Sequence, residues 1–141
     1  MDLGGRARGP DLRAQAQATV ILLDTNAIIW LAQEHRRARP LQAFSRLHIS
    51  PASLLELQFL VETGRLRFKD AASVEAIVSD GRWQLDEPQA GRWFTTACEF
   101  GWTRDPFDRL IAAHARLRRW KLATADEQLI EQLPPSAILA L

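Results

Sequence analysis

Residues 20–24 read Val20-Ile21-Leu22-Leu23-Asp24, a run of four apolar residues that ends at a carboxylate. A short, continuous apolar run is typical of a strand that is buried on both faces of a parallel sheet. Four further short segments have strand character, the last more weakly: residues 47–49, 83–85, 121–123 and 138–139. Because helical segments separate them, we predict an α/β domain with a central, mainly parallel sheet of about five short strands flanked by helices.

Helices are expected between these strands. The clearest begins at Pro51, where Ser50 can cap the helix and Gly64 can end it. The expected helical ranges are 27–33, 40–46, 51–63, 71–79, 89–100 and 106–120. Residues 1–18 show no sustained apolar period, so we expect a flexible N-terminal extension, partly helical over residues 11–18, before one domain over residues 19–141.

The composition is that of a globular protein, with 47% hydrophobic and 25% charged residues among 141. No apolar run approaches the roughly 18 residues needed to cross a bilayer, so we expect no membrane segment. Cys98 is the only cysteine, which excludes a disulfide framework and a cysteine zinc site, and we expect its thiol to be buried and inert. The expected compartment is the cytoplasm.

Basic residues gather in two places, although the net charge of the chain is only +1. From Arg104 to Lys121 six basic residues stand against two acidic ones, and a second group lies within residues 36–39. Such groups are commonly solvated surface, but beside an acidic catalytic site they are natural contacts for phosphate. The residues expected to contact RNA phosphates are Arg36, Arg37, Arg104, Arg109 and Arg116.

Carboxylates follow two of the expected strands. Asp24 directly follows the first strand, and Asp126 follows residues 121–123 after a step of two residues. Ligands of open α/β sheets collect at the carboxyl ends of the strands, so both acids are expected at one edge. Helix capping is the alternative, because Thr124 and Glu127 have the spacing of a capping box and would make Asp126 a helix-terminus acid.

Three further carboxylates are candidates for the same edge. Asp105 and Asp108 open the helix that begins at Pro106, where Asp105 is a good cap and Asp108 stands in the capping-box position. Glu56 lies on an earlier helix between apolar neighbours, and its alternative role is that of a surface glutamate. Helix capping explains the acids at the two helix starts separately, but it does not explain why all these acids should reach one edge of the sheet.

Carboxylates gathered at one edge repel one another, since two unit charges about 4 Å apart cost roughly 4 kcal/mol at an effective dielectric constant of about 20. A divalent cation relieves this repulsion, and oxygen ligands favour Mg²⁺ or Mn²⁺ over zinc. Mg²⁺ held by carboxylates keeps several waters and accepts phosphate oxygens, which suits phosphodiester hydrolysis. The sequence therefore predicts a metal-dependent site built from Asp24, Glu56, Asp126 and the pair Asp105 and Asp108.

Four segments of this chain, in this order, resemble PIN domains, and together they are similar to VapC-type toxins of type II toxin–antitoxin systems. They are Leu22-Leu23-Asp24-Thr25-Asn26, Ile49-Ser50-Pro51-Ala52-Ser53-Leu54-Leu55-Glu56, Arg104-Asp105-Pro106-Phe107-Asp108-Arg109-Leu110-Ile111-Ala112-Ala113 and Leu122-Ala123-Thr124-Ala125-Asp126-Glu127. The resemblance spans residues 20–132. It implies a PIN fold and a Mg²⁺- or Mn²⁺-dependent endoribonuclease.

The resemblance also implies a role for each residue. Asp24 and Asp108 would be the leading metal ligands, with Asp126 and Glu56 completing the catalytic pocket. Asp108 is preferred over Asp105 because it stands three residues before Ile111. The residues implied to orient the acids are Thr25, Asn26 and Thr124, assisted by Asp105. The implied partners are an RNA substrate, a second copy of the chain in a homodimer, and a cognate antitoxin that blocks the active site.

Three other functions stay open at this point. A non-catalytic PIN-like module that binds RNA or protein would have no need of four mutually repelling carboxylates. A DNA-cleaving nuclease is compatible with the chemistry, because metal-ion hydrolysis does not require a 2′-hydroxyl. A phosphoryl-transfer domain with an aspartyl nucleophile is disfavoured. One type needs a second aspartate two residues after the first, where this chain has Asn26. Another type needs a lysine at the end of a late strand, whereas Lys121 stands at the start of its strand.

Overall fold

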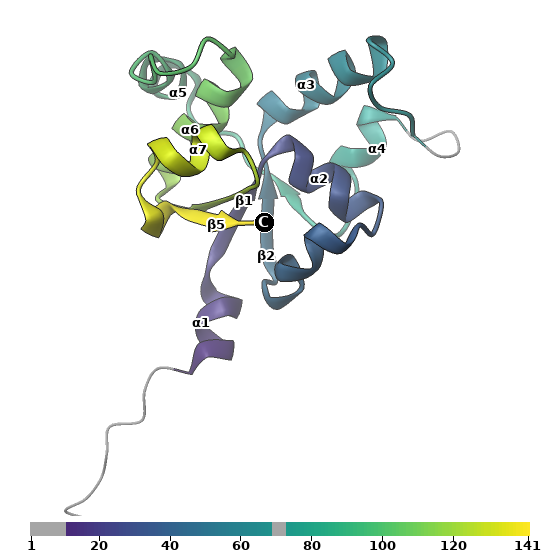
Figure 1. Cartoon of the computed structure of the whole chain (residues 1–141), viewed down its shortest axis with the longest axis vertical. Coiled ribbons are helices and arrows are strands. Elements are labelled where there is room, and N and C mark those ends of the chain that lie inside the picture. Colours follow the sequence, from purple (N-terminus) through teal and green to yellow (C-terminus); the bar gives the residue numbers. More distant parts are fainter. Residues whose placement is uncertain (1–10, 69–72) are drawn as a thin grey trace, which may run out of the picture.

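A five-stranded sheet forms the centre of the molecule. The structure is a computed structural model, and it describes residues 11–68 and 73–141. The strands are β1 (Val20–Leu23), β2 (Arg46–Ile49), β3 (Gln84–Leu85), β4 (Lys121–Thr124) and β5 (Ile138–Ala140). Their order across the sheet is β3-β2-β1-β4-β5, and every neighbouring pair is parallel. The predicted parallel sheet of about five strands is confirmed (Figure 1).

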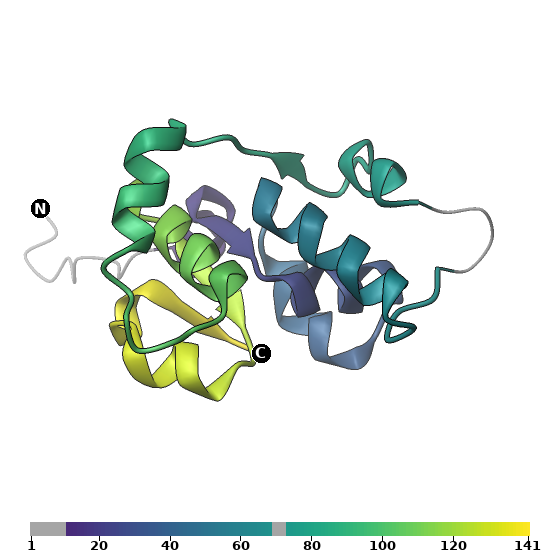
Figure 2. The same ribbon diagram turned by 90° about the horizontal axis from the view of Figure 1, so that it is seen from above.

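Helices cover the sheet and join its strands. The α-helices are α1 (Leu12–Ala18), α2 (Thr25–Ala32), α3 (Pro51–Glu62), α4 (Val74–Val78), α5 (Ala90–Ala97), α6 (Pro106–Arg118) and α7 (Glu127–Gln132). Two 3₁₀ helices complete the described chain, η1 (Arg36–Ala43) and η2 (Pro135–Ala137). Seen from above, α5, α6 and α7 gather at one end of the molecule and α2, α3 and α4 at the other (Figure 2).

Two clusters of buried side chains lie on the two faces of the sheet, as the alternation of side chains along a strand requires. Ile21 and Leu23 of β1 pack in one cluster with residues of α2, η1 and α4. Leu22, between them, packs in the other cluster with residues of α5, α6 and α7. The first apolar run is therefore buried on both faces, as its composition predicts.

The expected helix over residues 40–46 is wrong. This part of the chain forms the 3₁₀ helix η1, which ends at Ala43, and Arg46 already belongs to β2. Phe44 is already extended and Arg46 pairs with Val20 of β1, so pairing in the sheet takes the place of a helix there. The other expected helices are present: α2 begins two residues earlier than the expected range 27–33, and the remaining four are shorter than expected. Residues 71–72 of the expected range 71–79 lie outside the described residues.

Residues 11–18 of the expected extension form α1, as predicted, with Asp11 as the cap whose side chain accepts from the Arg13 amide. Residues 1–10 lie outside the described residues. Figure 1 shows α1 projecting beyond the amino edge of the sheet, and Leu12 in it is 76% exposed. That residues 1–18 are a flexible extension stays a prediction.

Two further expectations concern exposure. Cys98 is exposed at the end of α5, so the prediction of a buried thiol is wrong. The reason is local: α5 turns its apolar side, with Trp93 and Ala97, toward the core, and the chain leaves the helix at Cys98. Among the described residues, none of the helices is long and apolar enough to cross a membrane.

Candidate active site

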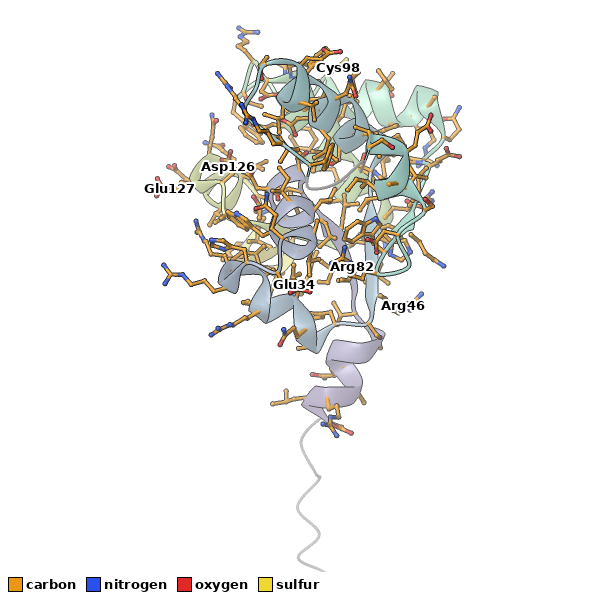
Figure 3. All side chains as sticks on the ribbon, turned by 90° about the vertical axis from the view of Figure 1, so that its right-hand side faces the viewer. Glu34, Arg46, Arg82, Cys98, Asp126 and Glu127 are labelled. Atoms are coloured by element: carbon orange, nitrogen blue, oxygen red, sulfur yellow. The ribbon has the colours of Figure 1, made fainter. Side chains whose placement is uncertain are left out.

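Carboxylates from four parts of the fold line one cavity at the carboxyl edge of the sheet. The cavity has a volume of about 190 Å³. Its lining contains every predicted acid and two of the predicted orienting residues: Asp24, Thr25, Asn26, Glu56, Leu60, Asp105, Asp108, Ile111, Asp126 and Leu129. Figure 3 places Asp126 toward the end of the molecule away from α1, whereas Arg46 at the start of β2 lies next to α1. The acids that were expected at one edge are brought together there.

Three of these aspartates cap helices that begin at the cavity. The Asp24 carboxylate accepts a hydrogen bond from the Ala27 amide of α2 at 2.8 Å. Asp105 accepts from the Phe107 amide of α6 at 2.8 Å, as predicted from its position before Pro106. Each of these helix N-termini presents partial positive charge to its carboxylate, which is a stabilising arrangement.

The alternative reading of this segment, a capping box formed by Thr124 and Glu127, holds only in making Asp126 an acid at the helix terminus. Thr124 belongs to β4, and Asp126 is the cap, accepting from the Gln128 amide at 2.9 Å and the Leu129 amide at 3.1 Å. The Thr124 hydroxyl oxygen instead accepts from the Asp126 amide at 3.0 Å. It also bonds to the Asp24 carboxylate, so Thr124 links the acids of β1 and β4.

A hydroxyl pair positions Glu56, which α3 presents to the cavity. The Thr25 hydroxyl donates to the Glu56 carboxylate and lies 3.1 Å from the hydroxyl oxygen of Ser53. Thr25 and Ser53 are both buried. Sequence reasoning predicted the orienting role of Thr25 but missed Ser53, whose only signal is that it stands three residues before Glu56, on the same side of the helix.

Burial raises the pKa of three acids. It raises the pKa of Asp24 to about 6, against hydrogen bonds from Thr124 and the Ala27 amide that lower it. Burial is also the largest cause at Asp108, whose pKa rises to about 7 with added repulsion from Asp105 and Asp126. The pKa of Glu56 is raised by burial as well, although its bond with Thr25 works in the opposite direction. The surroundings of these three acids thus favour their neutral form unless positive charge enters the cavity.

Asp108 differs from the other aspartates because its carboxylate caps no helix. Its backbone amide donates to Asp105 at 3.3 Å, and no residue within 11–68 and 73–141 forms a hydrogen bond with its side chain. The ion pairs among these residues involve Asp80, Asp86 and Glu99, and none of them reaches the cavity. The acids of the cavity therefore lack a cationic partner in the described part of the chain.

The donor set fits a hydrated divalent cation. As the described side chains stand, no group of three histidine, cysteine, aspartate or glutamate residues is close enough to hold a bare metal ion. Mg²⁺ binds through one or two carboxylates and keeps its remaining waters, which need about 30 Å³ each. A cavity of about 190 Å³ has room for that arrangement, and its ionisable ligands are all carboxylates.

The remaining predicted residues lie at differing distances from the cavity. The Asn26 side chain is exposed at its rim, and Arg104 is exposed beside Asp105. Arg109 donates from Nε to the Thr103 carbonyl at 2.8 Å. Arg116 lies eight residues beyond Asp108, about 12 Å along α6, and pairs with Glu99 at 2.8 Å.

Arg36 and Arg37 lie in η1, away from the cavity lining. Arg37 donates to the Leu141 carbonyl at 3.2 Å, and its guanidinium lies over the Trp30 ring at 4.6 Å from the ring centre. Part of its hydrogen-bonding capacity is therefore used within the fold. That these arginines contact RNA stays a prediction.

Comparison with known proteins gives a family and a set of similar folds. A model of the PIN domain family matches residues 21–133. No curated protein sequence matches the chain significantly. Solved structures similar to it include a VapBC complex from Salmonella typhimurium bound to DNA, at 25% identity and a TM-score of 0.60, covering 86% of this chain and 98% of that one.

Two further structures have the same fold at lower identity. One is VapBC2 from Rickettsia felis bound to a promoter DNA fragment, with 18% identity and a TM-score of 0.62, covering 86% of this chain and 98% of that one. The other is a toxin–antitoxin complex from Klebsiella pneumoniae, with 20% identity and a TM-score of 0.61, covering 85% and 96%.

Proposed function

This chain belongs to the PIN domain family, and on that premise we propose that it is a Mg²⁺- or Mn²⁺-dependent endoribonuclease, the toxin of a toxin–antitoxin pair. The observation that carries the proposal is the cavity in which Asp24, Glu56, Asp108 and Asp126 meet without a cationic partner among the described residues. The raised pKa values of Asp24 and Asp108 support it, because such carboxyls gain most from a bound cation.

Asp24 and Asp108 are the proposed principal ligands. Asp108 has both carboxylate oxygens available, whereas one oxygen of Asp105 caps α6. Asp24 also uses one oxygen as a cap, and a hydrogen bond with Thr124 further restrains its carboxylate. Glu56 and Asp126 also line the cavity and complete the set, acting through waters that they orient.

When bound, a divalent cation supplies an activated water and stabilises the charge that develops on the scissile phosphate. The protein contributes orientation and proton transfer. Thr25 and Ser53 hold Glu56 in one direction, so that its free carboxylate oxygen can accept a proton from an attacking water. The helix N-termini at Asp24, Asp105 and Asp126 keep three of the acids in place throughout.

We extend the proposal to partners. The similar structures are toxin–antitoxin complexes, and on this basis the chain binds a cognate antitoxin that covers the acidic cavity. It acts as a homodimer on cytoplasmic RNA. Arg104 and Arg109, next to the cavity, are its proposed phosphate contacts, and Arg36, Arg37 and Arg116 add longer-range attraction.

The test is cleavage of end-labelled total RNA by the purified, antitoxin-free chain, with Mg²⁺, with Mn²⁺ and with EDTA. The matched control is Asp24→Asn, which keeps a helix cap but removes the charge. We expect metal-dependent cleavage that leaves 5′-phosphate and 3′-hydroxyl ends and is lost in the control. An end-labelled, single-stranded DNA is run in parallel.

Cleavage of the DNA strand alone would move the assignment to a deoxyribonuclease. RNA binding without cleavage under any metal would favour the non-catalytic module. Cleavage that persists in both EDTA and the Asp24→Asn variant would contradict a metal site at these acids.

A further inference from the structure

Two phenylalanine rings stand exposed beside the acidic cavity. Phe59 of α3 is 47% exposed. Phe107 of α6 is partly exposed, and the two ring centres are 5.6 Å apart with an angle of 78° between the planes. In this edge-to-face pair the edge of one ring meets the face of the other, so the arrangement is fixed while ring surface stays open to solvent.

Both rings are tied to the acids by the helices that carry them. Phe59 follows Glu56 by three residues, which places it about 4.5 Å further along α3 on nearly the same side. Its neighbour Leu60 lines the cavity. Phe107 directly precedes Asp108, and its amide donates to the capping carboxylate of Asp105. The ring pair therefore forms part of the rim between α3 and α6.

We propose that the base of an unpaired nucleotide next to the scissile phosphate stacks on the Phe59 ring, with Phe107 holding that ring in position. The inference rests on the proposed nuclease function and adds a residue that binds the substrate. Unpaired bases stack on exposed aromatic side chains in nucleic-acid-binding proteins, independently of which base is present. A duplex keeps its bases stacked inside and cannot offer one to the ring.

Charge next to the rings agrees with this occupant. Arg104 is exposed in the loop just before Asp105, and no described residue forms a hydrogen bond or an ion pair with its side chain. A nucleotide whose base lies on Phe59 needs a cation near its phosphate, because the adjoining cavity is acidic. Aromatic rings beside a free arginine and a carboxylate cavity match a nucleotide better than an apolar peptide.

The exposed area of the Phe59 ring matches the size of one nucleotide base. A phenylalanine buries on the order of 200 Å² when fully enclosed, so at 47% exposure the open part of Phe59 is about 100 Å². One nucleotide base needs no more than one exposed ring face.

The experiment combines a protein variant with a substrate variant. Phe59→Leu keeps an apolar side chain at the position but removes the flat ring. Leu55→Ala is the matched control, because Leu55 is 53% exposed one turn earlier on the same helix and does not line the cavity. The substrate is an RNA that the wild-type chain cleaves, prepared with a single abasic nucleotide at each position flanking the cleaved bond.

We expect Phe59→Leu to raise KM for the intact RNA about tenfold with little change in kcat, and Leu55→Ala to change neither. The abasic nucleotide should raise the wild-type KM by a similar factor at one position only. In Phe59→Leu that penalty should disappear, because the base no longer has a ring to contact. An equal abasic penalty in the two proteins would overturn the stacking contact while leaving the nuclease proposal intact.

Binding gives a second measurement that does not depend on cleavage. In an Asp24→Asn background, we expect Phe59→Leu to lose about tenfold in affinity for a fluorescein-labelled, mixed-sequence unpaired RNA octamer, read by anisotropy. Unchanged affinity would overturn the proposal even if the chain cleaves nothing. So would a Phe59→Leu protein whose mass by light scattering falls from that of a dimer to that of a monomer, since the ring would then belong to self-association.

Discussion

Asp86 and Asp108 are two carboxylates of one fold in opposite surroundings. Asp86 comes directly after β3, and its carboxylate lies 2.7 Å from Nε2 of His114 and 2.8 Å from Nε of Arg118. Burial acts to raise the pKa of Asp86, but the bonds from Arg118 and His114 outweigh it and hold the pKa below its usual range. Asp108 has no such donors among the described residues, and its pKa rises to about 7.

The difference separates an acid that is paired within the fold from one that we propose binds a ligand. Asp86 joins the edge strand β3 to α6, because His114 and Arg118 both lie on that helix. Its charge is compensated within the fold and stabilises it. Asp108 lies at the other end of α6, where its charge costs stability unless a ligand compensates it. Both acids lie at the carboxyl edge of the sheet, so their position does not distinguish them. The presence or absence of a basic partner within the fold does.

The largest expected effect concerns which acid at the start of α6 binds the metal. Asp108→Asn should lower kcat/KM for RNA by about a thousandfold or more, because a leading ligand loses its charge. Asp105→Asn should retain activity within about tenfold, because asparagine caps a helix as well as aspartate does. The measurement is single-turnover cleavage at saturating Mg²⁺. Equal losses in the two variants would remove the distinction between capping and ligand acids.

The second effect is on the stability of the fold, where substitution of Asp86 should cost more than substitution of Asp108. Asp86→Ala should lower the free energy of unfolding by roughly 2–3 kcal/mol, because buried His114 then loses its acceptor. Asp108→Asn should raise this free energy, because it removes a buried charge and its repulsion in the metal-free protein. Urea unfolding in EDTA checks both. A stable Asp86→Ala protein would show that the contact between β3 and α6 holds without this acid.

The smallest effect is a dependence on pH. A carboxyl whose pKa is raised in the folded state weakens folding progressively as pH rises from the unfolded pKa to the folded one. The stability gained by Asp108→Asn in EDTA should therefore be larger at pH 7.5 than at pH 5.5, by about 1–2 kcal/mol.

Because the wild type and the Asp108→Asn variant are compared, the titration of the histidines contributes equally to both stabilities and cancels. Burial lowers the pKa of His48 and His114, which destabilises the fold as pH falls, and both residues are present in both proteins. Saturating Mg²⁺ at pH 7.5 should reverse the order of stability, since only the wild type keeps the full set of ligands. A gain that does not depend on pH would indicate that Asp108 ionises normally.

Sequence reasoning found the sheet and the acids because both follow local rules. Four apolar residues followed by Asp24 suffice to predict a buried strand that ends at a site, and the pair Asp105 and Pro106 suffices to predict a helix start. The resemblance to PIN domains, which the family match confirms, supplied the choice among the acids.

What the sequence did not reveal depends on contacts between distant parts of the chain. Ser53 meets Thr25 across 28 positions, and Asp86 meets Arg118 across 32. Neither separation is one of the short spacings, of two to four residues, that bring side chains together within a strand or a helix. The aromatic pair of Phe59 and Phe107 is of the same kind, since it exists only because α3 and α6 pack side by side.

The capping role of the aspartates has a genetic consequence. An aspartate codon becomes an asparagine codon by one nucleotide change, and asparagine can still cap α2 at position 24 or α7 at position 126. If the activity harms the cell that makes it, the commonest surviving inactive alleles should carry asparagine at these positions, ahead of alanine or glycine. Such alleles would silence the site yet still encode a folded chain that can compete for the same partners.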